Sequence, residues 1–337
     1  PVALTIATGR LAREGLLVTR GHAVETLAQV TDVVLDKTGT LTTGSMRVLR
    51  VDALSDVDER RCLALAGSLE QSSSHPLGVA ICRAAEDLPR YPVTGAHHET
   101  AAGIEATVDG RALRIGHQDF VAALVEHPDL PIIDHHEAAG TTLYLGAAGQ
   151  WLARFVIADL VRPDASMAVR ELSDMGCRVS LLSGDASATV KHIAGTVGIE
   201  QATGRETPDS KLARVAALQA SGRVVCMVGD GVNDAPVLAH AQVSVAMGEG
   251  TELARTQADC VLLGQHLRVL PAAIRLSQAT RRIIRENLWW AIIYNAVALP
   301  VAMSGLLTPW LAGLGMSLSS LWVVLNSLRL QRLKIGE

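Results

Sequence analysis

A short apolar run at 33–35 ends on an aspartate, a lysine and a glycine turn, in the segment DKTGTLT at 36–42. Apolar runs bounded by glycine turns are typical of strands buried in a sheet. We predict strands at 32–35, 151–157, 178–182, 224–228 and 243–246. The last four alternate with helical stretches at 165–175, 188–197, 211–220 and 235–239. Strands separated by helices predict a parallel α/β sheet with crossover helices.

The first predicted strand is separated from the others by roughly 110 residues, which is too long for a loop in a compact domain. The segment 48–150 is therefore predicted to be an inserted α+β domain. It divides the sheet domain into a first part at 29–47 and a second part at 151–265. Residues 1–28 are interpreted as the end of a helix and a linker, and 266–286 as a stalk helix.

No Asp, Glu, Lys, Arg or His occurs between Asn287 and Leu328, and arginines flank the stretch on both sides. Its length suffices for two membrane helices of about 20 residues each. A break near Pro309 predicts a helical hairpin at 287–330 with both cationic ends on the cytoplasmic side. A buried hairpin of a soluble protein is the alternative, but four tryptophans in the stretch fit interfacial belts.

Composition narrows the class of protein. Hydrophobic residues make up 49% of the 337 residues, and the mean hydropathy is +0.26. The chain is thus more apolar than a purely soluble enzyme and more polar than a bundle of membrane helices. The net charge of −4 argues against nucleic-acid binding. The five scattered cysteines are interpreted as reduced core thiols. No signal peptide is visible, and the first residue is not Met, so we expect a fragment of a longer protein.

Polar residues gather at the predicted strand exits, where open parallel sheets bind ligands. They lie in DKTG, in LLSGD at 181–185, in TPDSK at 207–211 and in VGDGVNDAP at 228–236. Asp36 is the candidate nucleophile for a γ-phosphate, forming an acyl phosphate. Asp36 and Asp230 suit Mg²⁺, and Lys211 and Ser183 suit the phosphoryl oxygens.

The residue two positions after Asp36 is Thr38 and not a second carboxylate. A carboxylate there would be a ready general base for water, so its absence predicts a phosphoenzyme that persists. Such an intermediate fits an energy-coupling machine better than a plain phosphatase. Asn233 and Asp234 are predicted to brace the metal or Lys211.

The motifs DKTGTLT, PDSK and GDGVNDAP resemble those of the P-type ATPases, and MGEGTELARTQADCVLL at 247–263 resembles the usual continuation. The resemblance implies a HAD-like Rossmannoid phosphorylation domain with an inserted α+β nucleotide-binding domain, followed by a two-helix transmembrane hairpin. It implies ATP and Mg²⁺ as cofactors and phosphorylation of Asp36, with Thr38 lending a backbone carbonyl to Mg²⁺. Ser183 stands where the family has a threonine. Gly184, Asp185 and Asn233 are the further residues expected to bind the cofactors.

The segment SLEQSSSHPLG at 68–78 resembles the nucleotide-binding signature of the heavy-metal branch. The resemblance implies that Glu70, His75 and Pro76 position ATP, although a His-Pro pair alone is more often a turn. Two glycines near the adenine are kept as Gly103 and Gly116. The family's first glycine and its asparagine are replaced by Ala101 and His117, which bears on nucleotide affinity or base preference.

In the predicted hairpin, YN at 294–295 and MSLSS at 316–320 resemble the copper(I)-transporting subgroup. The segments ATGRLAREGLLVTRGHAVETLA at 7–28 and VVLNSLRL at 323–330 resemble the bacterial pumps linked to cytochrome oxidase assembly. The transported Cu⁺, or Ag⁺, would then bind Tyr294, Asn295, Met316 and Ser320, a set that suits a soft ion. A zinc-type pump would be expected to place a carboxylate there. The alternative is helix packing by small and polar residues.

The resemblance covers the C-terminal half of such a pump. It implies ATP-driven copper(I) transport at the cell (inner) membrane, with multiple spans and cytoplasmic catalytic domains. The expected partners are membrane lipid, an N-terminal half with the actuator domain and the Cys-Pro-Cys helix, and a copper chaperone, with no nucleic acid. The alternatives are a membrane-associated HAD-type aspartyl phosphatase and a nucleotide or metal sensor that does not transport.

Overall fold

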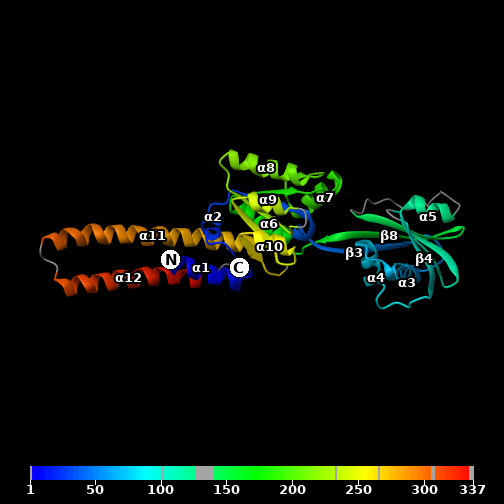
Figure 1. The fold of residues 1–337 in the computed structure, drawn as a ribbon, viewed down its shortest axis with the longest axis horizontal. Coiled ribbons are helices and arrows are strands. Elements are labelled where there is room, and N and C mark those ends of the chain that lie inside the picture. Colours follow the sequence, from blue (N-terminus) through cyan, green and yellow to red (C-terminus); the bar gives the residue numbers. More distant parts are fainter. Residues whose placement is uncertain are drawn as a thin grey trace. The chain divides into compact units, whose positions relative to one another are not determined.

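The computed structural model describes residues 2–99, 102–125, 140–231, 234–264, 266–304 and 308–333. They form two compact units, and Figure 1 labels many of their elements. The first unit comprises Pro1–Leu41 and Arg162–Glu337, and the second comprises Thr42–Val161. The second unit contains the segment 48–150 that is predicted as an insert and extends beyond it at both ends.

A seven-stranded sheet forms the centre of the first unit, with the order β1-β13-β12-β11-β2-β9-β10. All neighbours pair in parallel except β1 with β13. The strands are β1 (Leu16–Val18), β2 (Asp32–Asp36), β9 (Arg178–Leu182), β10 (Gln201–Thr203), β11 (Val225–Gly229), β12 (Val243–Met247) and β13 (Cys260–Leu262). Residues of β2 and β11 are buried throughout, as runs of apolar residues in a covered parallel sheet require.

Helices connect these strands, largely at the predicted positions. They are α2 (Ala23–Leu27), α6 (Ala165–Asp174), α7 (Ser187–Val197), α8 (Pro208–Ala220), α9 (Ala235–His240) and α10 (Glu252–Gln257). Val215 of α8, Leu238 of α9 and Ala254 of α10 share one core cluster with Val34 of β2 and Met227 of β11. This packing fixes the N-terminal ends of α8 and α9 beside the carboxyl ends of the central strands.

The second unit is built on a six-stranded antiparallel sheet with the order β3-β8-β7-β6-β5-β4. The strands are β3 (Thr42–Ala53), β4 (Val93–Glu99), β5 (Gly103–Val108), β6 (Arg111–Gly116), β7 (Thr141–Ala147) and β8 (Gln150–Val161). The helices are α3 (Glu59–Leu69), the 3₁₀ turn η2 (Glu70–Ser72), α4 (Pro76–Ala84) and α5 (Gln118–Val125). Phe155 and Ile81 are among the buried residues that join the sheet to α3 and α4.

The strand predicted at 151–157 is present but belongs to the other sheet. It is part of β8, which pairs antiparallel with β3 and β7 and not with the parallel strands of the first unit. The prediction was wrong on this point because a run of apolar residues reads the same in a buried antiparallel strand as in a parallel one. The parallel sheet resumes only at β9.

The C-terminal part of the first unit is a helical hairpin with α1 (Val2–Arg13) packed against it. The predicted stalk and first span form one continuous helix, α11 (Val269–Met303), which is followed by α12 (Pro309–Arg332). Two spanning helices were predicted. In the described residues only α12 is long and apolar enough to cross a membrane, by length and composition alone. The charge-free part of α11 begins at Asn287, inside the helix, and is therefore short.

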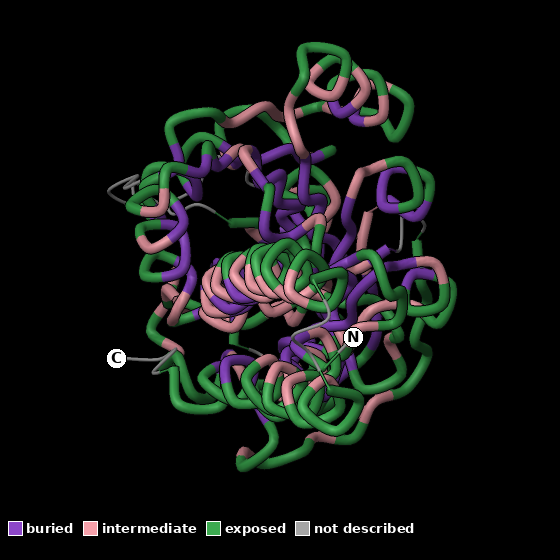
Figure 2. Tube along the Cα trace, turned by 90° about the vertical axis from the view of Figure 1, so that its left-hand side faces the viewer, coloured by how far each residue is buried: buried purple, intermediate pink, exposed green. Residues whose placement is uncertain are grey.

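Large apolar side chains on this hairpin are exposed, among them Leu299 at 66%, Met303 at 82% and Trp310 at 69%. Figure 2, which looks along the helices, shows their turns mostly as exposed or half-buried. Exposed apolar side chains over such a length indicate that the hairpin is covered by lipid or by other helices. All five cysteines are free thiols, as predicted, and four of them are buried.

Candidate active site

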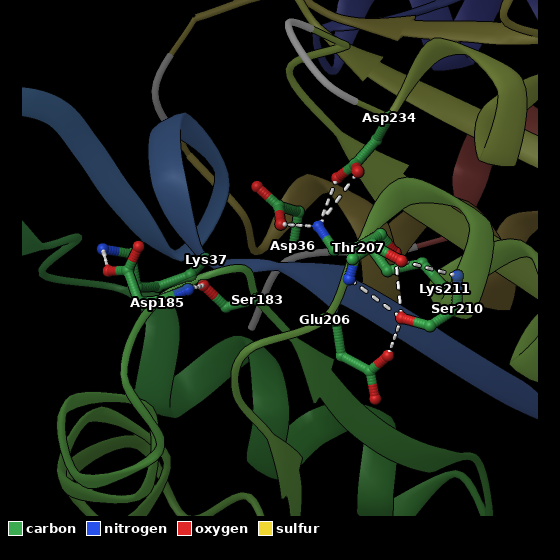
Figure 3. Close-up of polar contacts among 9 residues, drawn as sticks. All are labelled: Asp36, Lys37, Ser183, Asp185, Glu206, Thr207, Ser210, Lys211 and Asp234. Carbon is green, nitrogen blue, oxygen red and sulfur yellow. Dashed lines mark hydrogen bonds and ion pairs between the residues drawn. The ribbon is translucent and has the colours of Figure 1, made fainter.

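Asp36 is the last residue of β2 and lies with only 7% of its surface exposed. The Lys211 ammonium donates to its Oδ1 at 2.7 Å (Figure 3). The same ammonium donates to Oδ1 and Oδ2 of Asp234 at 2.9 and 2.8 Å. One buried lysine thus holds two buried carboxylates together, and three of the residues predicted from separate motifs form one cluster.

Local structure explains why these side chains meet. β2 lies between β11 and β9 in parallel register, so that the carboxyl ends of all three strands reach the same edge. Lys211 lies in the first turn of α8, which begins with a capping box between Thr207 and Ser210 and with a proline at its first position. Asp234 directly precedes α9, after β11.

The electrostatics of this cluster favour a proton on the nucleophile. Burial raises the pKa of Asp36 from its ordinary 3.8 to about 7. This net value includes the opposing effect of Lys211, which lowers the pKa, and the effect of the nearby carboxylates of Asp234 and Asp230, which raise it. For Lys211 burial lowers the pKa, but its two carboxylate partners outweigh burial and the net direction is upward. Lys211 is therefore a cation that opposes the protonation of Asp36.

The turn after Asp36 requires a glycine. Gly39 has φ of +68°, and a Cβ there would lie 2.8 Å from Oδ2 of Asp230. The guanidinium of Arg162 donates from Nε to the Thr40 carbonyl at 2.8 Å and from Nη2 to the Gly39 carbonyl at 2.9 Å. Arg162 is 2% exposed, and its role cannot be predicted from the sequence because an arginine directly after a strand carries no signal by itself.

The donor set at this sheet edge suits Mg²⁺. Asp36, Asp230 and Asp234 provide three carboxylates against the single ammonium of Lys211, and Asp230 acts on the titration of Asp36 through its charge. The described residues contain no group of three or more acidic, His or Cys side chains arranged around one metal. Mg²⁺ commonly uses only one or two carboxylates, with water and phosphate oxygens completing its shell. The carboxylates of Asp36 and Asp230 and the Thr38 carbonyl are the protein groups that would hold it.

The predicted phosphate-binding segment after β9 lies at the same sheet edge. Ser183 is 2% exposed, and its hydroxyl accepts from the Asp185 amide at 3.2 Å. The Asp185 carboxylate pairs with the Lys37 ammonium, which links this segment to the turn after Asp36 (Figure 3). Gly184 lies between them. Asn233, predicted as a cofactor contact, lies outside the described residues.

The second unit contains a cavity of about 350 Å³. Its walls include four of the predicted nucleotide-binding residues, namely Glu70, His75, Gly103 and Gly116. Pro76 is not a wall residue but starts α4, for which His75 is the N-cap: Nδ1 accepts from the Leu77 amide at 3.3 Å. The other ring nitrogen, Nε2, is then the one left for a ligand.

Two close approaches shape this cavity. Gly103 and Gly116 are paired across β5 and β6, and a Cβ on Gly116 would lie 2.1 Å from the Ala102 carbonyl oxygen. A Cβ on Gly78 would lie 2.3 Å from the Glu70 carboxylate, so this glycine admits Glu70 to the wall. Burial raises the pKa of Glu70, opposed by a hydrogen bond from Ser73 and by nearby histidines.

Three further wall residues with polar side chains were not predicted from the sequence: Ser73, His98 and Glu99. His98 and Glu99 end β4 and lie more than twenty residues from the His-Pro pair, so that only the fold brings them to this cavity. His117 also lines the cavity, at the position where the resembled family has an asparagine. Ala101 lies outside the described residues.

The residues predicted to bind the transported ion lie on α11 and α12 and do not form a closed cluster. Tyr294 is half-buried, and its hydroxyl would lie 2.9 Å from a Cβ on Gly315. Asn295 donates to the Ala291 carbonyl of its own helix at 2.8 Å. The remaining two, Met316 and Ser320, are exposed on α12.

Comparison with known proteins agrees with this geometry. The family model of the haloacid dehalogenase-like hydrolases matches residues 33–242. A copper-exporting P-type ATPase of Staphylococcus saprophyticus is 38% identical over 342 residues, covering 99% of this chain and 42% of that protein. One of Staphylococcus aureus strain JH9 is 40% identical with the same coverage. The chain therefore spans less than half the length of these relatives.

Two solved structures are also similar. A zinc-transporting PIB-type ATPase in the E2.Pi state has a TM-score of 0.86 and 34% identity, over 98% of this chain and 54% of the other. The catalytic domain of the CPx-ATPase CopB-B has a TM-score of 0.63 and 25% identity, over 80% of this chain and 98% of the other.

Proposed function

Because the chain belongs to the haloacid dehalogenase-like hydrolases, we propose that it is the ATP-binding and phosphorylation half of a heavy-metal P-type ATPase. The observation that carries the proposal is the buried triad in which Lys211 joins Asp36 to Asp234. A buried carboxylate at a strand exit, with a lysine at hydrogen-bond distance, is arranged for attack on phosphorus and not for fold stability alone.

The proposed chemical step is one displacement. A carboxylate oxygen of Asp36 forms a bond to the γ-phosphorus, the bond from that phosphorus to the β–γ bridging oxygen breaks, and ADP leaves with the electron pair. Lys211 favours the ionised form of Asp36 against the effect of burial, and it offers a donor to the phosphoryl oxygens as negative charge moves onto them. When bound, Mg²⁺ neutralises phosphate charge between the nucleotide and the carboxylates.

The phosphoenzyme is proposed to persist because the turn after Asp36 offers no general base. Thr38 supplies a hydroxyl where a carboxylate would be needed to activate water. Arg162 holds the Gly39 and Thr40 carbonyls and so keeps this turn in place during the reaction. Ser183 and the Lys37–Asp185 pair line the same edge and position the transferred phosphoryl group.

ATP is proposed to bind in the cavity of the second unit, with the adenine against Gly103 and Gly116 and with His75 and Glu70 as polar partners. The transported ion is proposed to be Cu⁺ or Ag⁺, because the hairpin offers a thioether, a phenol and an amide and lacks carboxylates after Glu286. The relatives named as copper-exporting support this choice. The location would be the cell membrane, with the hairpin of α11 and α12 in the membrane and with the seven-stranded sheet and the second unit cytoplasmic.

The whole pump would need parts that this chain does not supply. The proposed partners are the N-terminal half with its actuator domain and Cys-Pro-Cys helix, membrane lipid and a copper chaperone. We therefore expect the 337-residue chain to bind ATP and to accept its phosphate, without turnover or metal transport.

Labelling with γ-labelled ATP and Mg²⁺ tests the proposal. We expect acid-stable, hydroxylamine-labile label on the wild-type chain and none on the Asp36→Asn variant. Asp174→Asn, an exposed aspartate at the end of α6, is the matched control and should label normally. Undiminished label on the Asp36→Asn variant would overturn the assignment of the nucleophile.

A further inference from the structure

Two cavities adjoin on the hairpin, in a place that the proposed phosphorylation chemistry does not use. The first has about 490 Å³ and lies where α11 changes from a charged to a charge-free helix. Its walls combine basic and aromatic residues from both helices, including Arg282, Arg285, Glu286, Trp289, Trp322 and Arg329.

This first cavity, the basic groove, carries an excess of positive charge. Its carboxylate, Glu286, pairs with Arg282 at 3.2 Å and with Arg329 at 3.2 Å. For Arg285 no carboxylate partner is found among the described residues. Three guanidinium groups therefore face one carboxylate, and two positive charges are left uncompensated. Such a groove is suited to an anion with oxygen acceptors.

The second cavity, the apolar groove, also has about 490 Å³ and continues from the first, because Trp290 and Trp322 line both. The two indoles lie 5.4 Å apart between ring centroids. The Trp290 N–H donates to the Ser319 hydroxyl at 3.0 Å, so that its polar atom is satisfied within the protein. Leucines of α12 form half of the remaining wall, at Leu318, Leu321 and Leu325, and the other half consists of Tyr294, Gly315 and Ser319.

We propose that these two grooves together bind one anionic phospholipid, with the phosphate in the basic groove and an acyl chain along the apolar groove. The proposal rests on the proposed membrane placement of the hairpin. A guanidinium matches a phosphate with two parallel hydrogen bonds, and tryptophans mark the level of the headgroups in a membrane. The phosphate of the lipid thus meets the basic groove, and its acyl chain meets the apolar groove that continues from it.

A free phosphate ester would satisfy only half of this site. It would pair with the guanidinium groups but leave the leucine-lined groove without a partner. The apolar groove alone would accept any lipid, and the two uncompensated charges select an anionic one. A free phosphate ester and an anionic phospholipid share the phosphate group, and competition by a soluble phosphate ester distinguishes them.

Tryptophan quenching by brominated lipids provides the test, because three tryptophans line the basic groove. The full chain, with Trp310→Phe to remove the signal from the other end of the hairpin, is reconstituted in vesicles of phosphatidylcholine with a minor fraction of phosphatidylglycerol. The bromine is carried either by the phosphatidylglycerol or by an equal mole fraction of the phosphatidylcholine. We expect an association constant about fivefold larger for the brominated phosphatidylglycerol.

The selectivity must depend on the groove and not on charge in general. Arg285→Gln/Arg329→Gln should abolish the fivefold preference. Arg281→Gln/Arg332→Gln removes the same charge from the same two helices at residues that do not line the groove, and should keep it. Equal quenching by both lipids in the chain with all its arginines would overturn the proposed lipid site. Equal loss of the preference for phosphatidylglycerol in both double variants would overturn it as well.

Two further outcomes separate this proposal from the others. Loss of the preference in millimolar glycerol phosphate would show that a free phosphate ester is the ligand and would overturn the lipid assignment. Absence of quenching by either lipid would show that the hairpin does not enter the membrane, and the lipid site would fail with it. Phosphorylation of Asp36, measured in the same samples, reports on the proposed function independently of either result.

Discussion

The Asp36→Asn variant should be more stable than the wild-type chain at alkaline pH, although it lacks the proposed nucleophile. Asp36 is buried, and its pKa is raised from 3.8 to about 7. The amide keeps the size of the carboxylate and removes one of the two negative charges that share Lys211. Asp234 then remains as the partner of that lysine.

The direction and the size of this stability difference follow from the protons that Asp36 binds in the folded and in the unfolded chain. Below pH 3.8 the folded and unfolded chains both hold the proton, so the contribution of Asp36 to stability is fully present. Between about pH 4 and pH 7 the unfolded chain releases it while the folded chain keeps it, so stability falls as the pH rises. About three pKa units at 1.36 kcal/mol each give a loss of about 4 kcal/mol by pH 8.

Hydrogen exchange of the β2 and β11 amides in Mg²⁺-free buffer measures the opening of this sheet alone, which a global unfolding curve of a two-unit chain would not. The stability gained by Asp36→Asn should grow from pH 5 to pH 7 and level off above it. The same pH dependence in both chains, or a variant that is less stable at pH 8, would refute the reasoning from burial.

The remaining predictions concern the groups around Asp36 and the nucleotide. Lys211→Met should cost about 3–5 kcal/mol by leaving a buried carboxylate pair without its cation, as measured by the same exchange experiment. Gly39→Ala should raise the Mg²⁺ concentration needed for half-maximal labelling about tenfold, because φ is +68° and the new Cβ meets Asp230. Gly116→Ala should abolish ATP binding measured by calorimetry, since the new Cβ would meet a backbone oxygen of the segment that leads into the neighbouring strand. Phosphorylation of the same variant by acetyl phosphate should persist. Loss of both ATP binding and phosphorylation by acetyl phosphate would contradict a nucleotide role for Gly116.

The cluster around Asp36 was predictable because its geometry follows from chain order. Once β2, β9 and β11 are read as parallel neighbours, their exits must share an edge, and Asp36, Ser183 and Asp230 must lie there. The position of Lys211 in the first turn of a helix is predictable because Pro208 marks the start of that helix in the sequence. These are local signals combined with one topological rule.

Other parts were not predictable, for a physical reason. Arg162 binds two carbonyls more than a hundred residues earlier in the chain, and the Lys37–Asp185 pair is equally distant in sequence. Neither residue type nor spacing encodes such contacts. The strand at 151–157 was placed in the wrong sheet because burial of both faces hides the alternation that distinguishes the two sheet types.

The most direct test of the central claim is to locate the phosphate. The chain is incubated with ATP and Mg²⁺, treated with borohydride, which reduces an acyl phosphate to the alcohol, and digested for mass spectrometry. We expect homoserine at position 36, dependent on ATP and absent after hydroxylamine. Homoserine at any other aspartate, or unmodified Asp36 in a chain that carries acid-stable label, would contradict the central claim.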